Sequence, residues 1–345
     1  MSAHPTPGPR RLFIVSDTLA GGMGALVRAH AEWFGAHAWE VVLAAPADGS
    51  APDTTVRFVE IPAVRSTRRA DQMLRAGRAL RRARRQYGAG AVVHVHGMRS
   101  FLLTRLAGLP KPYVSVHGAH PSPDDPAGYD VLRKAWFRVI PRLARGATTG
   151  EPRPEKGWSF TPFASPLLAQ LDVLPFPAAG STPTFVWLGL LDDRKQPELF
   201  VRALAGAPRA RGVLAGDGPR AAEIAALIRD LDAPVEMVGH ADPVPLLQQA
   251  WALCLFARSE GTPLAVMESM WAGRTVIASD LPGIRYLVGD TGVLADDVAV
   301  VAAAIAELAD DHALAVQRGS EAAARIRALI TPDTPWAQLE RSYTA

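Results

Sequence analysis

The sequence predicts an α/β protein with two doubly wound domains, each built on a parallel sheet. Short β-branched or apolar runs alternate with longer helical patterns along the chain, which is typical of parallel strands joined by helices. The same alternation starts again at about residue 184. A chain of 345 residues is also too long for one ordinary hydrophobic core, so the two halves are expected to fold separately.

The expected elements follow from these patterns. Strands are predicted over 12–17, 40–46, 56–61, 91–97 and 112–118, and then over 184–189, 211–216, 235–239, 251–257 and 274–280. Helices are predicted over 24–36, 69–87 and 99–107, and then over 196–206, 219–231, 243–250, 263–272 and 297–328.

The domain boundary is expected between about 150 and 182, where the chain is rich in Pro, Gly and Ser and lacks periodicity. We therefore place a first domain over 1–165 and a second over 166–331. Two such domains facing each other would form a cleft lined by the carboxyl ends of both sheets, where ligands bind to doubly wound folds.

Composition excludes several classes of protein. Hydrophobic residues make up 48% and charged residues 21% of the chain, as in soluble globular proteins. The net charge of +3 is too small to imply a nucleic-acid binder. No apolar run approaches the roughly 18 residues that span a bilayer. Cys254 lies in the apolar run AWALCLFA and is expected to be a buried thiol, which fits a cytoplasmic protein.

The stretch RSEGTPLAVME (258–268) places Glu260 in a loop and Glu268 in the second turn of the helix that follows. Thr262 is expected to be the N-cap, and Pro263 suits the first helical position because its missing N–H is not needed there. The free N–H groups at the start of this helix would bind an anion such as a diphosphate. Glu268 would then reach a ribose and Glu260 a sugar. The alternative is that both carboxylates are solvated.

Basic and glycine-rich stretches follow the neighbouring strands. Asp192 and Asp193 could bind the metal of a metal-dependent transferase, but Arg194 and Lys195 follow at once and offer cations to a diphosphate without a metal. A solvated loop is the alternative. The stretches VLAGDGPR and VEMVGH also end strands at the same edge of the sheet. Together these loops predict a site for a nucleoside diphosphate.

The stretches GLLDDRKQ, LAGDGP, VEMVGH and SEGTPLAVMESMWAGRTVIASDLPGI occur in this order within residues 184 to 295. They resemble the donor domain of the retaining glycosyltransferases of family 4. The resemblance includes the family's two glutamates separated by seven residues. It implies the GT-B fold, in which two Rossmann-like domains enclose an interdomain cleft, and a C-terminal helix over 332–345 that crosses back to the first domain. Pro282, Gly283 and Tyr286 depart from the family, which often has two glycines and a glutamate there.

The resemblance also implies roles for the residues of the site. Arg194 and Lys195 would hold the donor diphosphate, Glu268 the ribose, and Glu260 the transferred sugar or its phosphate. The backbone of Gly261, Thr262, Pro263 and Leu264 would act with Glu260, and the strand-end residues Gly189, Gly216, Gly239 and His240 would complete the donor site. No cofactor and no metal are implied, because the nucleotide sugar is a co-substrate.

The glycine-rich stretch SDTLAGGMGALV (16–27) follows the first strand and only partly fits a dinucleotide fingerprint. The end of the second strand, LAAP, also lacks the acidic residue that would hold an NAD ribose. A nicotinamide enzyme is therefore disfavoured. By the resemblance, Gly21, Gly22 and Gly24 match a loop that borders the donor phosphate and the acceptor.

His94 and His96 lie on one face of a predicted strand. They could bind a metal, but no cysteine or carboxylate cluster accompanies them, so no metal site is predicted. VSVHGAH resembles the family's next strand, in which the position of His117 contacts the donor sugar near its reacting carbon. The alternative for His117 is a structural role.

Residues 65–88 contain nine arginines and one acidic residue. Met73, Ala76, Leu80, Ala83 and Tyr87 form a thin apolar stripe, and Arg75, Arg78, Arg82 and Arg85 line another side. These residues predict a helix that covers the sheet with a solvated basic face. The alternative is that this face meets an anionic acceptor or the inner face of a membrane.

The resemblance therefore implies a metal-independent, retaining glycosyltransferase. It would move a sugar from a UDP- or GDP-type donor to a hydroxyl of a small-molecule or lipid-linked acceptor by a front-face mechanism. His117, Glu260, Arg194 and Lys195 are the expected catalytic residues. The Pro- and Arg-rich composition favours bacterial secondary-metabolite, or antibiotic, biosynthesis. The alternatives are a non-catalytic nucleotide-sugar binder or an epimerase of the same fold, and then a NAD-dependent oxidoreductase.

Overall fold

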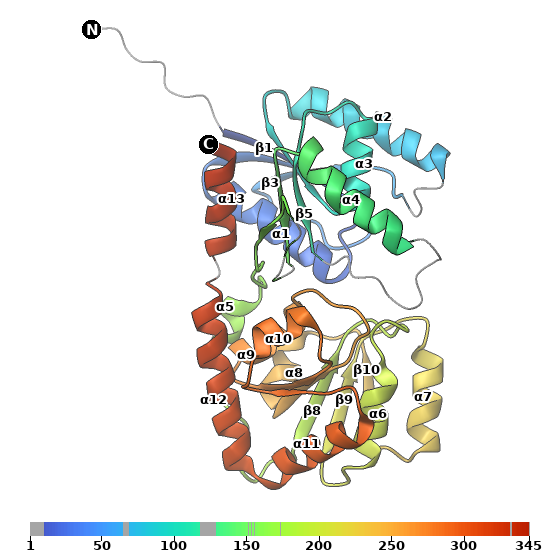
Figure 1. Cartoon of the computed structure of the whole chain (residues 1–345), viewed down its shortest axis with the longest axis vertical. Helices are drawn as coiled ribbons and strands as arrows, with labels where there is room; N and C mark the ends of the chain where they lie inside the picture. The colour runs from blue at the N-terminus through green and yellow to red at the C-terminus, as the bar shows by residue number, and fades with distance from the viewer. Residues whose placement is uncertain are drawn as a thin grey trace, which may run out of the picture. The chain divides into compact units, whose positions relative to one another are not determined.

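A computed structural model of the chain describes residues 10–64, 69–117, 129–150, 152, 154, 156–172, 174–331 and 333–344, except for the side chains of 129 and 130. The described residues form two compact units (Figure 1). One unit is drawn from 1–117, 131–166 and 333–345, and the other from 118–130 and 167–332.

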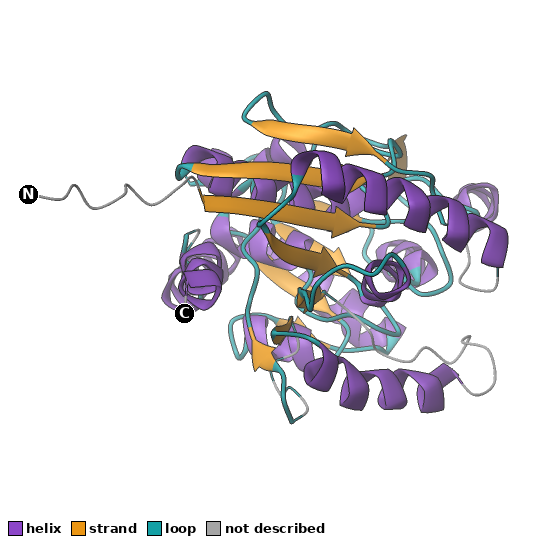
Figure 2. Ribbon diagram, turned by 90° about the horizontal axis from the view of Figure 1, so that it is seen from above, coloured by secondary structure: helices purple, strands orange, loops and turns teal. Residues whose placement is uncertain are grey.

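In its described part, the first unit has a seven-stranded parallel sheet in the order β3-β2-β1-β4-β5-β6-β7. Figure 2 shows these strands running alongside one another with helices around them. The strands are β1 (Arg10–Ser16), β2 (Trp39–Ala45), β3 (Val56–Glu60), β4 (Val92–His96), β5 (Tyr113–Val116), β6 (Gly146–Thr149) and β7 (Ser159–Phe160). The helices are α1 (Gly21–Ala36), α2 (Ala70–Tyr87), α3 (Met98–Leu106), α4 (Tyr129–Leu143) and α13 (Thr334–Thr344).

Over its described residues, the second unit has a six-stranded parallel sheet in the order β10-β9-β8-β11-β12-β13. Its strands are β8 (Thr184–Leu188), β9 (Arg211–Ala215), β10 (Val235–Gly239), β11 (Ala252–Leu255), β12 (Thr275–Ala278) and β13 (Val293–Leu294). Its helices are α5 (Leu168–Leu171), α6 (Pro197–Ala205), α7 (Ala221–Asp230), α8 (Pro243–Gln249), α9 (Leu264–Trp271), α10 (Pro282–Val288), α11 (Val298–Asp310) and α12 (His312–Leu329).

The buried faces explain why these segments form parallel sheets. The central strands β1 and β11 are buried along most of their length, as expected for strands covered on both faces. Trp187 and Trp251 fill the core of the second unit. Cys254 is fully buried there, so the predicted buried thiol is confirmed, and burial raises the pKa of this thiol.

The sequence located most of the elements. Every predicted strand coincides with an observed one, and their ends differ by at most two residues. The prediction of one helix over 297–328 was wrong, because Asp311 is extended and its carboxylate accepts a hydrogen bond from the N–H of Leu314, which starts a second helix. Helices α4, α5 and α10 and the short strands β6, β7 and β13 were not predicted.

Candidate functional site

The loops after β8, β9 and β10 are joined by backbone hydrogen bonds. The N–H of Gly216 donates to the carbonyl of Gly239 at 2.7 Å, and the N–H of Gly189 donates to Ala215 at 3.1 Å. A β-carbon on Gly216 would lie 1.7 Å from the carbonyl oxygen of Gly189, so only glycine fits. The structure thus brings Gly189, Gly216 and Gly239 together at the carboxyl edge of this sheet, and the exposed His240 follows directly.

The basic loop after β8 meets the acidic loop after β11. Nζ of Lys195 lies 2.6 Å from Oε1 of Glu260, and Arg194 forms an ion pair with the same oxygen. Arg194 also donates to the carbonyl of Ser259 at 3.3 Å. The N–H of Arg258 in turn donates to the carbonyl of Arg194 at 2.8 Å, which ties the two loops together. The sequence predicted these three charged residues for one site, and they lie in direct contact.

Glu260 is held in its ionised form. Burial by itself raises the pKa of this carboxyl, but Lys195 and Arg194 outweigh burial, and the pKa of Glu260 lies below its ordinary value. The side chain of Glu260 is only 14% exposed and that of Lys195 only 12%. Two cations therefore share one oxygen of a single carboxylate.

The two aspartates of the same loop point to different partners. Asp192 accepts from the backbone N–H of Lys195 at 2.9 Å and lies 3.9 Å from Arg194. Asp193 is mostly exposed and pairs with Arg220 at 3.3 Å. Both aspartates therefore serve cations of the protein, in contrast to an acidic pair that converges on one point.

Helix α9 begins one residue later than predicted. The N–H of Met267 donates to the carbonyl of Pro263 at 3.3 Å, so Pro263 is the N-cap and Leu264 is the first helical residue. The prediction of Thr262 as N-cap was wrong, because Pro263 itself has an extended backbone with ψ of 132°. Pro263 makes no side-chain hydrogen bond that would cap the first N–H groups of α9. Glu268 lies in this helix and is 7% exposed.

The first turn of α10 packs directly on the loop before α9. A β-carbon on Gly283 would lie 1.7 Å from the carbonyl oxygen of Gly261, so the two backbones touch. Pro282 begins α10, and its missing N–H is not needed at that position. Gly283 has a clear role here, because it sets the position of the loop that carries Gly261.

In the first unit, the predicted glycine-rich loop is mostly helix. Gly21, Gly22 and Gly24 form the first turns of α1, which starts three residues earlier than predicted. Gly24 must be glycine because a β-carbon there would lie 1.8 Å from the carbonyl oxygen of Leu19. The preceding loop is fixed by Asp48, which accepts from the N–H of Leu19 at 2.6 Å.

The predicted histidines of the first unit lie in one cluster. His94 and His96 are fully buried on the same face of β4, and His30 of α1 joins them. Ligand atoms of these three residues lie within 4.8 Å of one another, and among the described residues they are the only such group of potential metal ligands. His117 stacks on His96 with ring centroids 5.0 Å apart. The sequence did not predict that His30 lies in this cluster.

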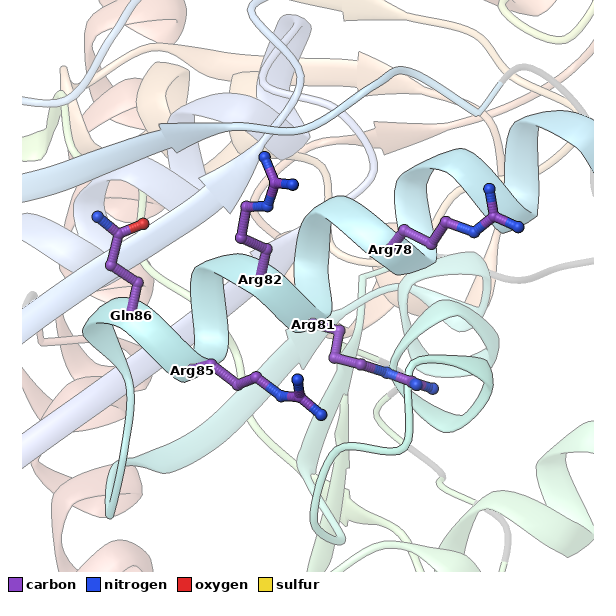
Figure 3. A pocket seen from close by; sticks show the side chains of 5 residues that line it. All are labelled: Arg78, Arg81, Arg82, Arg85 and Gln86. Atoms are coloured by element: carbon purple, nitrogen blue, oxygen red, sulfur yellow. The ribbon is translucent and has the colours of Figure 1, made fainter.

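Helix α2 carries the predicted basic face. Met73, Ala76, Leu80 and Ala83 are buried, so the apolar stripe is confirmed, with Tyr87 half-buried at its end. The opposite face carries an open, shallow hollow lined by Arg78, Arg81, Arg82, Arg85 and Gln86, which Figure 3 shows from close by. Among the described residues, no carboxylate pairs with Arg78, Arg82 or Arg85.

Several residues that shape these sites were missed from the sequence. His30 continues the apolar stripe of Leu26, Val27 and Phe34 along α1, so its burial could have been read from the helical period. Tyr343 reaches the same cluster from α13. No local pattern places a residue that is 313 positions away in the chain next to His30.

Comparison with protein families identifies the chain. The model described as "Glycosyl transferases group 1" matches residues 182–311, and the model described as "Glycosyltransferase Family 4" matches residues 20–169. The chain belongs to the group 1 glycosyltransferases with the GT-B fold. Comparison with curated protein sequences gave no significant match.

Solved structures share the fold of this glycosyltransferase. Sucrose-phosphate synthase from Thermosynechococcus elongatus superposes with a TM-score of 0.81 at 20% identity, over 97% of this chain and 98% of that one. HepE from Anabaena in complex with UDP and glucose gives 0.77 at 14% identity, over 97% and 99%. WaaG, a glycosyltransferase involved in lipopolysaccharide biosynthesis, gives 0.72 at 13% identity, over 96% and 99%.

No helix in the described part of this glycosyltransferase is both long and apolar enough to cross a membrane.

Proposed function

We propose that this glycosyltransferase transfers a sugar from a nucleoside diphosphate sugar to a hydroxyl of its acceptor, with retention of anomeric configuration. The observation that carries the proposal is the contact of Arg194 and Lys195 with Glu260, next to the start of α9. Cations and free backbone N–H groups favour a diphosphate at this point. HepE, which has a similar fold, binds UDP and glucose. UDP sugars are therefore the first donors to test, and GDP sugars the second.

Each residue of the site has a proposed task. Arg194, Lys195 and the start of α9 stabilise the negative charge that develops on the leaving diphosphate. Glu268, in the same helix, accepts hydrogen bonds from the ribose hydroxyls. Glu260 and the backbone of residues 261–264 hold the transferred sugar or its phosphate, and the loop at Gly239 and His240 lies near the base.

The proposed mechanism is front-face and needs no metal. The leaving diphosphate accepts the proton of the acceptor hydroxyl, while Arg194 and Lys195 compensate its charge in place of a divalent cation. The partners of Asp192 and Asp193 support this part of the proposal, because both carboxylates already serve a backbone N–H or an arginine of the protein.

A turnover assay tests the proposal. The purified chain is incubated with a panel of UDP and GDP sugars and hydroxyl acceptors, and release of the nucleotide and the anomeric configuration of the product are followed. We expect an α-linked product from an α-linked donor without added metal and in the presence of a chelator. Binding without turnover would instead support a non-catalytic nucleotide-sugar binder, and a changed sugar on the recovered donor would support an epimerase. Tight binding of NAD without binding of UDP or GDP would support the oxidoreductase.

The acceptor is proposed to be anionic, or linked to an anionic lipid, because of the basic face of α2. Arg78, Arg82 and Arg85 lie three and four residues apart, so they share one face of the helix. A membrane rich in anionic lipid attracts such a face by about 1 kcal/mol per basic residue. Sedimentation with anionic vesicles at physiological salt tests this contact, and failure to sediment would leave a free anionic acceptor. A role in antibiotic biosynthesis stays a prediction from composition.

A further inference from the structure

A continuous chain of hydrogen bonds crosses the core of the first unit, and its first half consists of histidines. Nε2 of His117 lies 2.7 Å from Nδ1 of His96. Nε2 of His96 lies 2.8 Å from Nδ1 of His30. Nε2 of His30 lies 3.2 Å from the hydroxyl of Tyr343, which belongs to α13. Each ring therefore uses one nitrogen toward each neighbour.

The second half leads from Tyr343 to the backbone of β5. The hydroxyl of Tyr343 lies 2.5 Å from Nδ1 of His94, and Nε2 of His94 lies 2.9 Å from Oγ of Ser115. Oγ of Ser115 lies 2.8 Å from Oγ1 of Thr148, which donates to the carbonyl of Val114 at 3.4 Å. A carbonyl can only accept, so the chain ends there.

Every member of this chain is neutral. Burial lowers the pKa of His30, His94 and His96 well below the ordinary value, and it lowers the pKa of His117 to about 4. Burial likewise raises the pKa of the Tyr343 hydroxyl. A neutral imidazole has one N–H donor and one acceptor nitrogen. A histidine between two neighbours therefore donates to one of them and accepts from the other. The direction of one hydrogen bond thus determines the direction of the next.

The carbonyl of Val114 sets that direction. Because Thr148 donates to this carbonyl, it accepts from Ser115, and Ser115 accepts from the Nε2–H of His94. Nδ1 of His94 is then the acceptor for the hydroxyl of Tyr343. If every donor and acceptor in the chain were exchanged, the same pairs would still be hydrogen-bonded, but Thr148 could no longer donate to Val114. That arrangement therefore has one hydrogen bond fewer.

The distances at Tyr343 give the same direction independently. A separation of 2.5 Å, as between Tyr343 and His94, suits an O–H donor and is too short for a usual N–H donor. A separation of 3.2 Å, as between Tyr343 and His30, suits an N–H donor. Tyr343 therefore donates to His94 and accepts from His30.

We infer that the chain from Val114 through Tyr343 fixes His117 as its Nε2–H tautomer, which leaves Nδ1 of His117 as an acceptor for a ligand hydroxyl rather than for a phosphate oxygen. A phosphate oxygen would require an N–H at Nδ1. Tyr343 and His30 are thus positioning residues that act on His117 from α13 and α1. The identity of the hydroxyl, as one of the donor sugar, rests on the proposed function, whereas the tautomer does not.

The alternative to this hydrogen-bonded chain is a metal site formed by His30, His94 and His96. A metal there would need an acceptor nitrogen from each of His30, His94 and His96 at the same point. In the assigned tautomers, those nitrogens already accept from His96, Tyr343 and His117, respectively. The hydrogen-bonded chain therefore accounts for every ring nitrogen of the group, and metal binding would have to break it.

Nitrogen-15 NMR of the imidazole rings tests the tautomer directly, with the signals of His117 assigned from a His117→Gln variant. In the unmodified chain we expect Nε2 of His117 to carry the proton and Nδ1 to be bare. In Tyr343→Phe the N–H of His30 loses its acceptor, and a buried unpaired donor is costly. His30, His96 and His117 should therefore all switch to the other tautomer, which places the proton on Nδ1 of His117. Tyr113→Phe is the matched control. It removes a hydroxyl that also holds α13, through the carbonyl of Ser342 at 2.5 Å, but it lies outside the chain.

Ser115→Ala supplies a second variant in case Tyr343→Phe does not fold. It removes the acceptor of His94, so the same reversal should travel through Tyr343 to His117. A proton on Nδ1 of His117 in the unmodified chain, or unchanged nitrogen shifts in both variants, would overturn the inference. One equivalent of a transition metal in the purified protein, lost in His94→Ala, would overturn it in favour of a metal site.

Calorimetry separates this inference from the proposed function. Tyr343→Phe should weaken binding of the nucleotide sugar about five-fold, the worth of one hydrogen bond, while binding of the nucleotide alone stays unchanged. If no nucleotide or nucleotide sugar binds the unmodified chain, the proposed function fails and the tautomer result still stands. If the nucleotide sugar binds equally well to Tyr343→Phe with a reversed His117, the acceptor role of Nδ1 is wrong.

Discussion

Lys195 and Glu260 form a largely buried ion pair with 2.6 Å between Nζ and Oε1, and Arg194 joins it at the same oxygen. One carboxylate thereby holds the two cations that the donor diphosphate is proposed to use. The cations are kept in place before any ligand arrives, which lowers the cost of ordering them on binding. The same contact means that a diphosphate and Glu260 compete for the two cations.

Replacing Glu260 should therefore have opposite effects on the binding of phosphate ligands and on sugar transfer. In Glu260→Ala, Arg194 and Lys195 lose their carboxylate, so inorganic pyrophosphate and UDP should bind several-fold more tightly, while sugar transfer is lost. Loss of a buried partner should also lower the free energy of unfolding by about 1 to 3 kcal/mol, allowing for the partial exposure of Arg194. Calorimetry and urea unfolding measure the two effects. Glu236→Ala is the control, because Glu236 pairs with Arg211 where both side chains are exposed. Weaker pyrophosphate binding would show that Glu260 mainly positions the cations.

The lowered pKa of Glu260 predicts how stability depends on pH. A carboxyl whose pKa is depressed in the folded state contributes stability that is fully present above its ordinary value of 4.5 and is lost as the pH falls through the folded value. The free energy of unfolding of the unmodified chain should therefore approach that of Glu260→Gln as the pH falls through the lowered pKa of Glu260. Urea unfolding of both chains at several pH values measures the difference. A difference that stays constant down to about pH 2 would contradict the prediction.

The contact of Gly283 with Gly261 predicts a strong effect of one methyl group. Gly283→Ala places a carbon 1.7 Å from a backbone oxygen, so the loop before α9 must shift. We expect a loss of about 1 to 3 kcal/mol in stability and weaker binding of UDP. Gly180→Ala is the matched control, because no atom of the described residues lies within 4 Å of the added carbon and the backbone there is not left-handed. Thermal unfolding and calorimetry check both variants, and equal behaviour of the two would refute the role of Gly283.

The same contact illustrates what the sequence could and could not predict. Strand positions followed from runs of apolar residues, because a strand buried on both faces must be apolar along its length. The break between α11 and α12 was missed because the apolar period continues across Asp311, whose extended backbone ends α11 and whose carboxylate caps the start of α12. Gly283 could not be assigned a role, since a close approach of two backbones leaves no mark in the local pattern.

Some features of the candidate site could likewise be predicted from the sequence, and others could not. Glu260, Arg194 and Lys195 could be predicted together, because loops at the carboxyl ends of parallel strands share one edge of the sheet. The ion pairs among them could not, since they depend on side-chain conformations. In the first unit, the period of β4 placed His94 and His96 on one face, but Tyr343 comes from α13 and meets them only through the tertiary fold.

The basic face of α2 predicts a salt-sensitive contact with anionic membranes. Replacing Arg78, Arg82 and Arg85 together by Gln removes three charges from one helix face, and about 1 kcal/mol per charge corresponds to roughly a 100-fold loss of affinity or more. Sedimentation with vesicles that contain anionic lipid measures the loss. The triple replacement of Arg202, Arg209 and Arg229 by Gln removes the same charge from exposed positions of the second unit and should have little effect. Equal losses in both variants would show that net charge matters, not the face of α2.

Glu268 offers the sharpest test of the donor orientation, because its proposed partners are hydroxyl groups that can be removed from the ligand. Glu268→Gln should weaken UDP binding by about 10- to 100-fold, the worth of hydrogen bonds to a charged group. A UDP analogue without the two ribose hydroxyls should bind the unmodified chain just as weakly, and the variant should no longer distinguish UDP from this analogue. Calorimetry of both ligands with both chains gives the coupling between the carboxylate and the hydroxyls. Because Glu268 is 7% exposed, circular dichroism must first show that the variant folds. Additive losses would mean that Glu268 supports α9 without touching the ribose.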